Sequence, residues 1–233
     1  MGRGLAKKSL RIKVSKSIGD VSALFYLPSK AEQALVFAHG AGAGMKNKFM
    51  EQAALMLTEQ GIATLRFNFP YMEKGKKVPD PKPVCFAAIS TAVDKASALC
   101  PKLPLFAGGK SFGGRMTSTV ASEGMIENMK GIIFFGFPLH APGKPSNERA
   151  EHLYKVNIPM LFLQGTRDSL ASLDLLKPVI KKLGKKAELF IIEGADHSFH
   201  VPKDNKITDS EVIELICKEI KRWMEALISQ SAF

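Results

Sequence analysis

Six short apolar runs, each about as long as a β-strand, alternate along this chain with segments of helical periodicity. Runs that are mainly apolar on both faces are typical of strands covered on both faces, as in parallel sheets flanked by helices. The six runs are Leu35 to Ala38, Ala63 to Phe69, Leu105 to Ala107, Ile132 to Phe135, Met160 to Leu163 and Leu189 to Ile192. Before them, Leu10 to Val14 and Val21 to Leu27 flank a glycine-containing turn and predict a hairpin. We therefore expect an α/β fold with an eight-stranded, mainly parallel sheet and helices on both faces.

Apolar residues at helical spacing mark the segments between these runs. One predicted face contains Met50, Ala53, Ala54 and Leu57, and another contains Phe86, Ile89, Val93 and Ala96. Near the C-terminus, Thr208 and Glu211 have the spacing of a capping box, which predicts the start of a long helix. Its expected buried stripe is Val212, Leu215, Ile216, Ile220, Trp223 and Leu227. No linker or repeat interrupts the 233 residues, so we expect a single domain over 1–233.

Charge and cysteine content limit the possible partners. The 33 basic and 22 acidic side chains leave a formal net charge of +11, spread over short lysine groups without interleaved aromatic residues. This pattern argues against nucleic-acid binding, because single-stranded nucleic acids are bound by aromatic side chains that stack on the bases. The three cysteines are far apart and form no C-x-x-C pair, so neither a disulfide framework nor a metal site is expected. We predict a cytoplasmic protein with no membrane span, since no apolar segment approaches about 20 residues.

One strand-to-helix junction carries the pattern G-x-S-x-G. Gly109-Lys110-Ser111-Phe112-Gly113 follows the apolar run at Leu105 and opens a helix-like segment. Glycines two positions before and after a serine permit a sharp turn that presents the hydroxyl at the edge of the sheet. A phosphate-binding loop would need a glycine where Pro104 stands, so that interpretation is rejected. Ser111 is therefore the candidate nucleophile.

An acid and a base follow Ser111 in the order that this kind of sheet requires. A serine hydroxyl needs an imidazole to accept its proton and a carboxylate to orient that imidazole. Asp168 and His197 each follow an apolar run directly, which places them with Ser111 at the carboxyl ends of parallel strands. Asp196 and His200 are the alternative acid and base. We favour Asp168 because Asp196 adjoins His197 in sequence, which makes an orienting hydrogen bond awkward.

Attack on a carbonyl also requires two N–H donors for the oxyanion. The amide of Phe112, at the start of the predicted helix, is one candidate. The small-residue run Gly40 to Gly44 follows another strand, and its backbone can approach a ligand closely. From it we select Ala41 as the second donor, with Gly42 as the next choice. Gly42 is also a candidate substrate contact. His39 is expected to brace this loop.

These motifs resemble those of the α/β-hydrolase superfamily over essentially the whole chain. The resemblance implies the strand order 1-2-4-3-5-6-7-8 with an antiparallel second strand. More narrowly, four segments are similar to a small dienelactone-hydrolase-like branch that includes a testis-expressed predicted hydrolase and a subunit of a nuclear acetyltransferase complex. These segments are Leu65 to Pro70, Gly109 to Arg115, Pro138 to Lys144 and Ala195 to Ser198. Dienelactone hydrolases themselves have a cysteine where this chain has Ser111, so their activity is not transferred.

We therefore expect a serine hydrolase of carboxylic esters or related acyl bonds, with no cofactor and a small-molecule acyl substrate. The longer connections, Pro70 to Pro83 and Phe137 to Asn147, are too short for a large lid, which predicts an open site. Lys110, Arg115 and His140 are candidate substrate contacts, and together with Arg66 they favour an anionic acyl group. The alternative is that Lys110 and Arg115 pair with structural carboxylates. A different class of function, a non-catalytic hydrolase fold that binds an acidic partner through its basic surface, also stays open.

Overall fold

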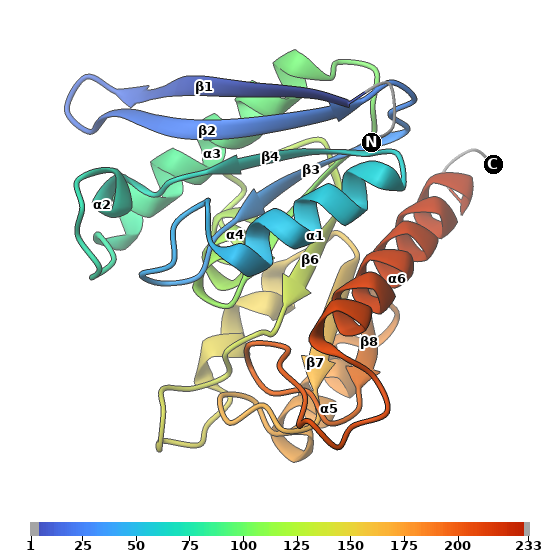
Figure 1. The fold of residues 1–233 in the computed structure, drawn as a ribbon. Coiled ribbons are helices and arrows are strands. Elements are labelled where there is room, and N and C mark those ends of the chain that lie inside the picture. Colours follow the sequence, from blue (N-terminus) through green and yellow to red (C-terminus); the bar gives the residue numbers. More distant parts are fainter. Residues whose placement is uncertain (1–4, 231–233) are drawn as a thin grey trace.

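The computed structural model describes residues 5–230 and contains one sheet of eight strands over that range (Figure 1). The strands are β1 (Leu5–Ser15), β2 (Gly19–Pro28), β3 (Gln33–Ala38), β4 (Ile62–Phe67), β5 (Leu105–Lys110), β6 (Met129–Phe135), β7 (Met160–Gly165) and β8 (Ala187–Ile192). Their order is β1-β2-β4-β3-β5-β6-β7-β8. The strands from β4 to β8 pair in parallel, whereas β2 is antiparallel to both β1 and β4. The predicted α/β class, the strand order and the mainly parallel sheet are confirmed.

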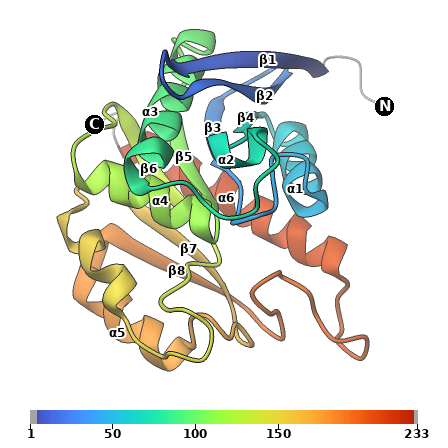
Figure 2. The same ribbon diagram turned by 90° about the vertical axis from the view of Figure 1, so that its left-hand side faces the viewer.

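Helices cover both faces of this sheet (Figures 1 and 2). α1 (Lys48–Glu59) and α6 (Asp209–Gln230) lie on one face, where they enclose a core with residues of β3, β6 and β7. α3 (Lys82–Leu99), α4 (Phe112–Ser122) and α5 (Leu173–Leu183) lie on the other face. The short elements are α2 (Pro70–Glu73), η1 (Glu148–Lys155) and η2 (Gly184–Lys186). Within residues 5–230 the two longer connections therefore contain no large helical lid; α2 is four residues long.

The C-terminal helix begins at the predicted capping box. The Thr208 amide donates to a carboxylate oxygen of Glu211 over 2.7 Å, and the Glu211 amide donates to Thr208 Oγ1 over 3.3 Å. The predicted burial of Leu215 was wrong: its side chain is 40% exposed. The buried stripe includes Ile213 and Cys217 instead. Both pack into the core that α6 shares with α1 and the sheet. Leu215, three residues after Val212, lies at the opposite edge of the stripe.

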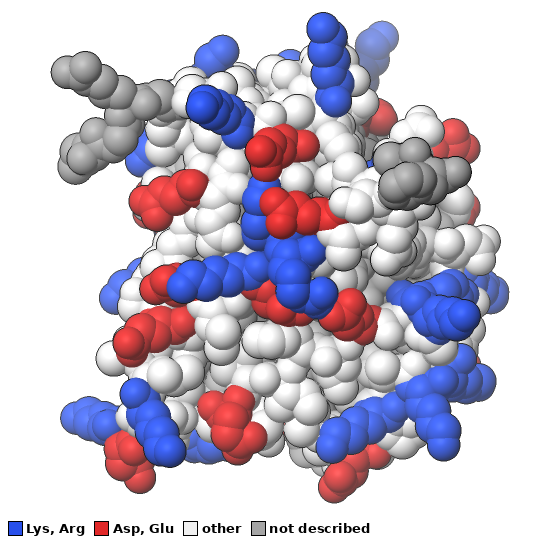
Figure 3. Space-filling view, turned by 90° about the vertical axis from the view of Figure 1, so that its right-hand side faces the viewer, with Lys and Arg blue, Asp and Glu red and all other residues white. Residues whose placement is uncertain are grey.

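Charges on the face that α6 occupies are mixed in sign. Figure 3 shows blue and red side chains side by side across the middle of this face. Lys221 pairs with Glu32 and Glu225, and Arg222 pairs with Glu188 and Glu219. The lysine-rich composition thus gives no continuous basic patch on this face.

Candidate active site

Ser111 lies at a sharp turn between β5 and α4. Its backbone has φ of 50° and ψ of −113°, a conformation that residues with a side chain rarely adopt. Such strain costs about 1–3 kcal/mol and persists only where the surrounding structure enforces it. The turn puts Ser111 at the carboxyl end of the parallel strands.

Close packing of the backbone explains the glycines of the motif. A Cβ added to Gly109 would lie 2.4 Å from the carbonyl oxygen of Ala38, and one added to Gly113 would lie 2.5 Å from the same oxygen. These separations are far below a van der Waals contact, so neither position accepts a side chain without movement of the backbone. The two glycines hold the end of β3, and the loop that follows it, against the turn at Ser111.

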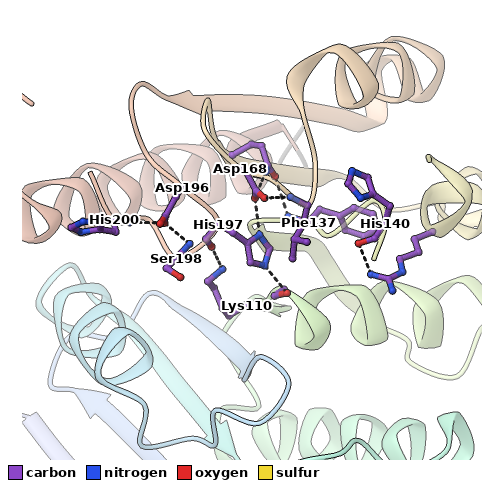
Figure 4. Close-up of polar contacts among 12 residues, drawn as sticks. Lys110, Phe137, His140, Asp168, Asp196, His197, Ser198 and His200 are labelled. Carbon is purple, nitrogen blue, oxygen red and sulfur yellow. Dashed lines mark hydrogen bonds and ion pairs between the residues drawn. The ribbon is translucent and has the colours of Figure 1, made fainter. Parts of the chain in front are cut away.

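A chain of hydrogen bonds joins Ser111, His197 and Asp168 (Figure 4). His197 Nε2 lies 2.8 Å from Ser111 Oγ, and His197 Nδ1 lies 2.7 Å from Asp168 Oδ2. A carboxylate can only accept, so Nδ1 carries the proton and Nε2 is left to accept the proton of the serine. The three residues follow β5, β7 and β8, which brings them to one edge of the sheet although they are far apart in sequence.

The carboxylate of Asp168 is buried and held from several directions. Asp168 is 4% exposed, its Oδ1 accepts the amide of Leu170 over 2.8 Å, and its Oδ2 also accepts Nε2 of Gln164. Gln164 in turn accepts the amide of Phe137 through Oε1 over 3.1 Å. The sequence reasoning missed Gln164, although a glutamine inside the otherwise apolar run of β7 was the available signal.

The alternative acid and base are engaged elsewhere. Asp196 Oδ1 accepts the amides of Ser198 and His200 over 2.7 and 3.0 Å, so this carboxylate stabilises its own loop. His200 pairs with Asp209 at the start of α6 over 2.8 Å. In Figure 4, His200 lies apart from His197, on the far side of Asp196.

The loop after β3 lies against the candidate nucleophile. A Cβ on Gly40 would lie 3.9 Å from Cβ of Ser111. His39 braces the loop, because its Nδ1 donates to the carbonyl of Gly40 and its Nε2 accepts the amide of Phe69 over 3.0 Å. Burial lowers the pKa of His39 to about 4, which keeps this ring neutral.

Within the described chain, the amides of Ala41 and Phe112 donate to no protein group, so both are available to an added ligand. The amide of Gly42 donates to the hydroxyl of Tyr71 over 3.3 Å, and Gly42 itself is exposed. Gly42 is therefore an exposed residue of the loop after β3, next to Ala41.

The four residues that the sequence suggested as contacts for an anionic acyl group have different surroundings. The ammonium of Lys110 donates to the carbonyl of His197, whereas Arg66 is fully buried under Tyr26, with its guanidinium 4.7 Å from that ring. His140 is 5% exposed, and its ring donates to the carbonyl of Ala141 over 2.9 Å. Arg115 is half-buried beside Phe112 and has no ion pair with any described carboxylate.

A second serine–histidine pair joins α4 to η1. Ser118 Oγ is 2.7 Å from Nε2 of His152, but Ser118 is fully buried. The same hydroxyl also lies 3.0 Å from the carbonyl of Arg115 in its own helix, so it is held inside the protein and is not presented to a substrate. Burial and the nearby charges of Arg115 and Lys82 lower the pKa of His152 to about 4. This pair fits a structural role.

A hollow of about 510 Å³ adjoins the histidine loop. It lies between Phe49 at the start of α1, Phe199 and the first turn of α6, with both charged and apolar lining. A second hollow, of about 450 Å³, lies at the opposite end of β5, near Leu105. Among residues 5–230 there is no group of three or more metal-ligating side chains and no helix that is long and apolar enough to cross a membrane.

The sheet carries a strained serine at the β5–α4 turn and an acid and a histidine after later strands. These are the defining features of the α/β-hydrolase class. A family model described as an alpha/beta hydrolase domain matches residues 31–225, so the chain belongs to that family.

Solved structures with the same fold include a dienelactone hydrolase from Anabaena variabilis, with a TM-score of 0.77, 18% identity, and coverage of 96% of this chain and 99% of that one. A serine hydrolase without a lid from Xanthomonas campestris has a TM-score of 0.71 and 20% identity, with 96% of each chain covered. Est1E from Butyrivibrio proteoclasticus has a TM-score of 0.70 and 17% identity, covering 95% of this chain and 99% of that one. At these identities the likeness establishes the fold and leaves the substrate open.

Proposed function

We propose that this hydrolase cleaves a carboxylic ester or a related acyl bond through Ser111, His197 and Asp168. Ser111 Oγ attacks the carbonyl carbon while Nε2 of His197 accepts the serine proton, and Asp168 stabilises the imidazolium that forms. Collapse of the tetrahedral intermediate passes that proton to the leaving group and leaves an acyl-enzyme. Water, deprotonated by His197, then attacks the acyl carbon, and the acid is released as the proton returns to Ser111.

Two amides are proposed to stabilise the oxyanion, those of Ala41 and Phe112. Both are without a protein partner in the described chain, and the amide of Phe112 lies at the N-terminus of α4, where the helix dipole favours negative charge. Loss of one such donor typically costs about 2.7–4 kcal/mol of transition-state stabilisation. No cofactor takes part in any of these steps.

One observation carries this proposal: Ser111 Oγ lies 2.8 Å from Nε2 of a histidine whose other nitrogen is bound by a buried carboxylate. The strained backbone of Ser111 adds support, since strain of this kind is retained where it serves a site. Membership of the small dienelactone-hydrolase-like branch and a cytoplasmic location are further parts of the proposal, and both rest on sequence features alone.

Arg115 suggests which acyl groups fit. It lies one helical turn after Ser111, and helical side chains point back toward the N-terminus, so we propose that its guanidinium reaches an acyl group held at Ser111. Its Nε is buried without a partner, and no described carboxylate neutralises it. Arg149 is close enough to lower the pKa of Arg115 further, beyond the larger effect of burial. We propose that Arg115 binds an anionic group of the acyl moiety, with Gly42 at the entrance and His140 shaping the wall through its loop.

Hydrolysis of matched p-nitrophenyl esters tests both parts of the proposal. Wild type is expected to release a burst of nitrophenol equal to one acyl group per Ser111, and Ser111→Ala is expected to abolish it. A hemisuccinate ester is expected to react faster than a neutral butyrate ester, and Arg115→Met should remove that preference without slowing the butyrate. Activity unaffected by Ser111→Ala would refute the mechanism, and equal rates for the two esters would refute the anionic preference.

A further inference from the structure

Lys110 is a half-buried cation directly behind the candidate catalytic histidine. It is the last residue of β5, and strand alternation directs its side chain to the face of the sheet that α1 and α6 cover. Its ammonium donates to the main-chain carbonyl of His197 (Figure 4). It also lies over two aromatic rings, 5.1 Å from the centre of Phe199 and 6.0 Å from that of Phe49.

The contact between Lys110 and His197 needs space beside the end of β6, where the chain has a glycine. Gly136 follows β6 with φ of +72°. A Cβ at this position would lie 3.2 Å from Nζ of Lys110 and 3.4 Å from Nδ1 of His197. Lys110, Gly136 and the imidazole of His197 therefore pack directly against one another.

No carboxylate within ion-pair distance compensates this ammonium among residues 5–230. Burying a cation without a paired anion is costly, and an apolar side chain of similar size would fill the place at lower cost. Stability alone therefore gives no reason for a lysine at this position. Its one hydrogen-bond partner, the carbonyl of His197, indicates where its contribution lies.

That carbonyl has no other hydrogen-bond partner in the described chain. The neighbouring residues have other partners: the side chain of Asp196, just before His197, accepts the amides of Ser198 and His200, which follow it. Lys110 thus holds the main chain at the one residue whose ring must span two partners, Ser111 and Asp168. A shift of this anchor moves the imidazole relative to both.

We propose that Lys110 is a positioning residue, whose ammonium fixes the main chain of His197 so that the imidazole bridges Ser111 and Asp168. This role replaces the substrate contact that the sequence suggested for Lys110, and it rests on the proposed function. The cation–π contacts with Phe49 and Phe199 keep the ammonium aimed at the carbonyl.

Ionisation of Lys110 links this role to pH. Burial lowers its pKa to about 8, although the charges of Asp168 and Asp196 act in the opposite direction. These two carboxylates and His197 are the titratable groups that face it. Above about pH 8 the ammonium becomes a neutral amine, which is a weaker donor to the carbonyl. The acylation rate is therefore expected to decline on the alkaline side as Lys110 loses its proton.

Lys110→Met tests the proposal, with Lys110→Gln as a milder variant that keeps a neutral donor and Lys102→Met as a control at an exposed lysine. We expect Lys110→Met to lower kcat by about 10- to 100-fold, as for small misplacements of a catalytic group, with KM within about twofold. Lys110→Gln should show a smaller loss of the same kind, and both variants should lose the alkaline decline. A raised KM with unchanged kcat would identify a substrate contact, and unchanged kinetics in either folded variant would also overturn the proposal.

A measurement without substrate separates this proposal from the proposed function. The proton that Nδ1 of His197 shares with Asp168 should give a low-field ¹H resonance in the wild type and in Lys102→Met. In Lys110→Met this resonance should broaden or disappear while the thermal unfolding temperature is kept or raised. An unchanged resonance would overturn the positioning role. A lost resonance in a protein that hydrolyses no ester would uphold positioning and refute the hydrolase proposal.

Discussion

Replacing Gly113 with alanine sets two physical effects against each other. Gly113 is in the first turn of α4, where alanine is a better helix former by about 0.8–1.0 kcal/mol. Its added Cβ would lie 2.5 Å from the carbonyl oxygen of Ala38 and 2.6 Å from that of His39. Helix propensity alone predicts stabilisation, whereas the close approach predicts destabilisation.

The steric effect is expected to win. Carbon–oxygen contacts lie near 3.3 Å or more, so the end of β3 must retreat by about 0.8 Å from the turn at Ser111. Overpacking of this kind costs about 1–3 kcal/mol, which leaves a net loss of up to about 2 kcal/mol after the gain in propensity. The retreat also carries Ala41 away from Ser111, and misplacement by about 1 Å can cost about 100-fold in rate.

Urea unfolding and the rate of labelling by a fluorophosphonate probe measure the two consequences separately. Gly124→Ala, just beyond the far end of α4, is the control because a Cβ there would have no neighbour within 4 Å. Its positive φ is expected to cost about 1–2 kcal/mol, with the labelling rate unchanged. A Gly113→Ala protein that is more stable than wild type, or labels at the wild-type rate, would refute the steric reasoning.

Three further results are expected. Asp168→Asn should slow labelling by about 1,000- to 10,000-fold with little change in unfolding free energy, because the amide no longer selects the tautomer of His197 that accepts the serine proton; labelling within tenfold of wild type would contradict this. Although burial raises the pKa of Glu73, hydrogen bonds from Ser22, Asn68 and Arg11 bring it to about 2, below its ordinary value of 4.5. Glu73→Gln should therefore destabilise the fold by about 1–2 kcal/mol at pH 7, a difference that shrinks as pH falls from about 5 toward 2 in parallel urea titrations; a loss independent of pH would contradict the assignment. The three cysteines are buried, and burial raises the pKa of Cys85 and Cys217 to about 12, so Ellman's reagent should react with none of them before unfolding and with all three after it.

The central strands β3 to β7 were predictable because strands buried on both faces leave a run of apolar residues in the sequence. Every run named from the sequence contains a strand, although β4 ends at Phe67, two residues before the predicted end at Phe69. The family resemblance supplied the strand order, which the pattern alone could not. The three residues of the candidate triad could also be named from the sequence, because residues that follow parallel strands converge at one edge of the sheet. The glycines of the elbow could be named from sequence, but their closeness to Ala38 depends on β3, which is distant in the chain.

Side-chain partners were less predictable, because they depend on which neighbour covers each residue. Leu215 matches the helical period but lies at the uncovered edge of α6. Gln164 supports Asp168 from inside an apolar strand, and nothing in its local sequence names that partner. From sequence, Lys110 was a candidate substrate contact beside the nucleophile, and nothing nearby in the chain indicated its hydrogen bond to a carbonyl 87 residues later.

The central claim is that Ser111 is the activated nucleophile. The most direct measurement is to treat the folded protein with a fluorophosphonate probe and to map the modified peptide by mass spectrometry. Wild type is compared with Ser111→Ala and with Ser118→Ala. The second variant is a control, because Ser118 is a buried serine that also contacts a histidine. We expect labelling only on the peptide that contains Ser111, complete loss in Ser111→Ala, and an unchanged rate in Ser118→Ala. Labelling that persists in Ser111→Ala, or a folded wild-type protein that takes up no probe, would contradict the account.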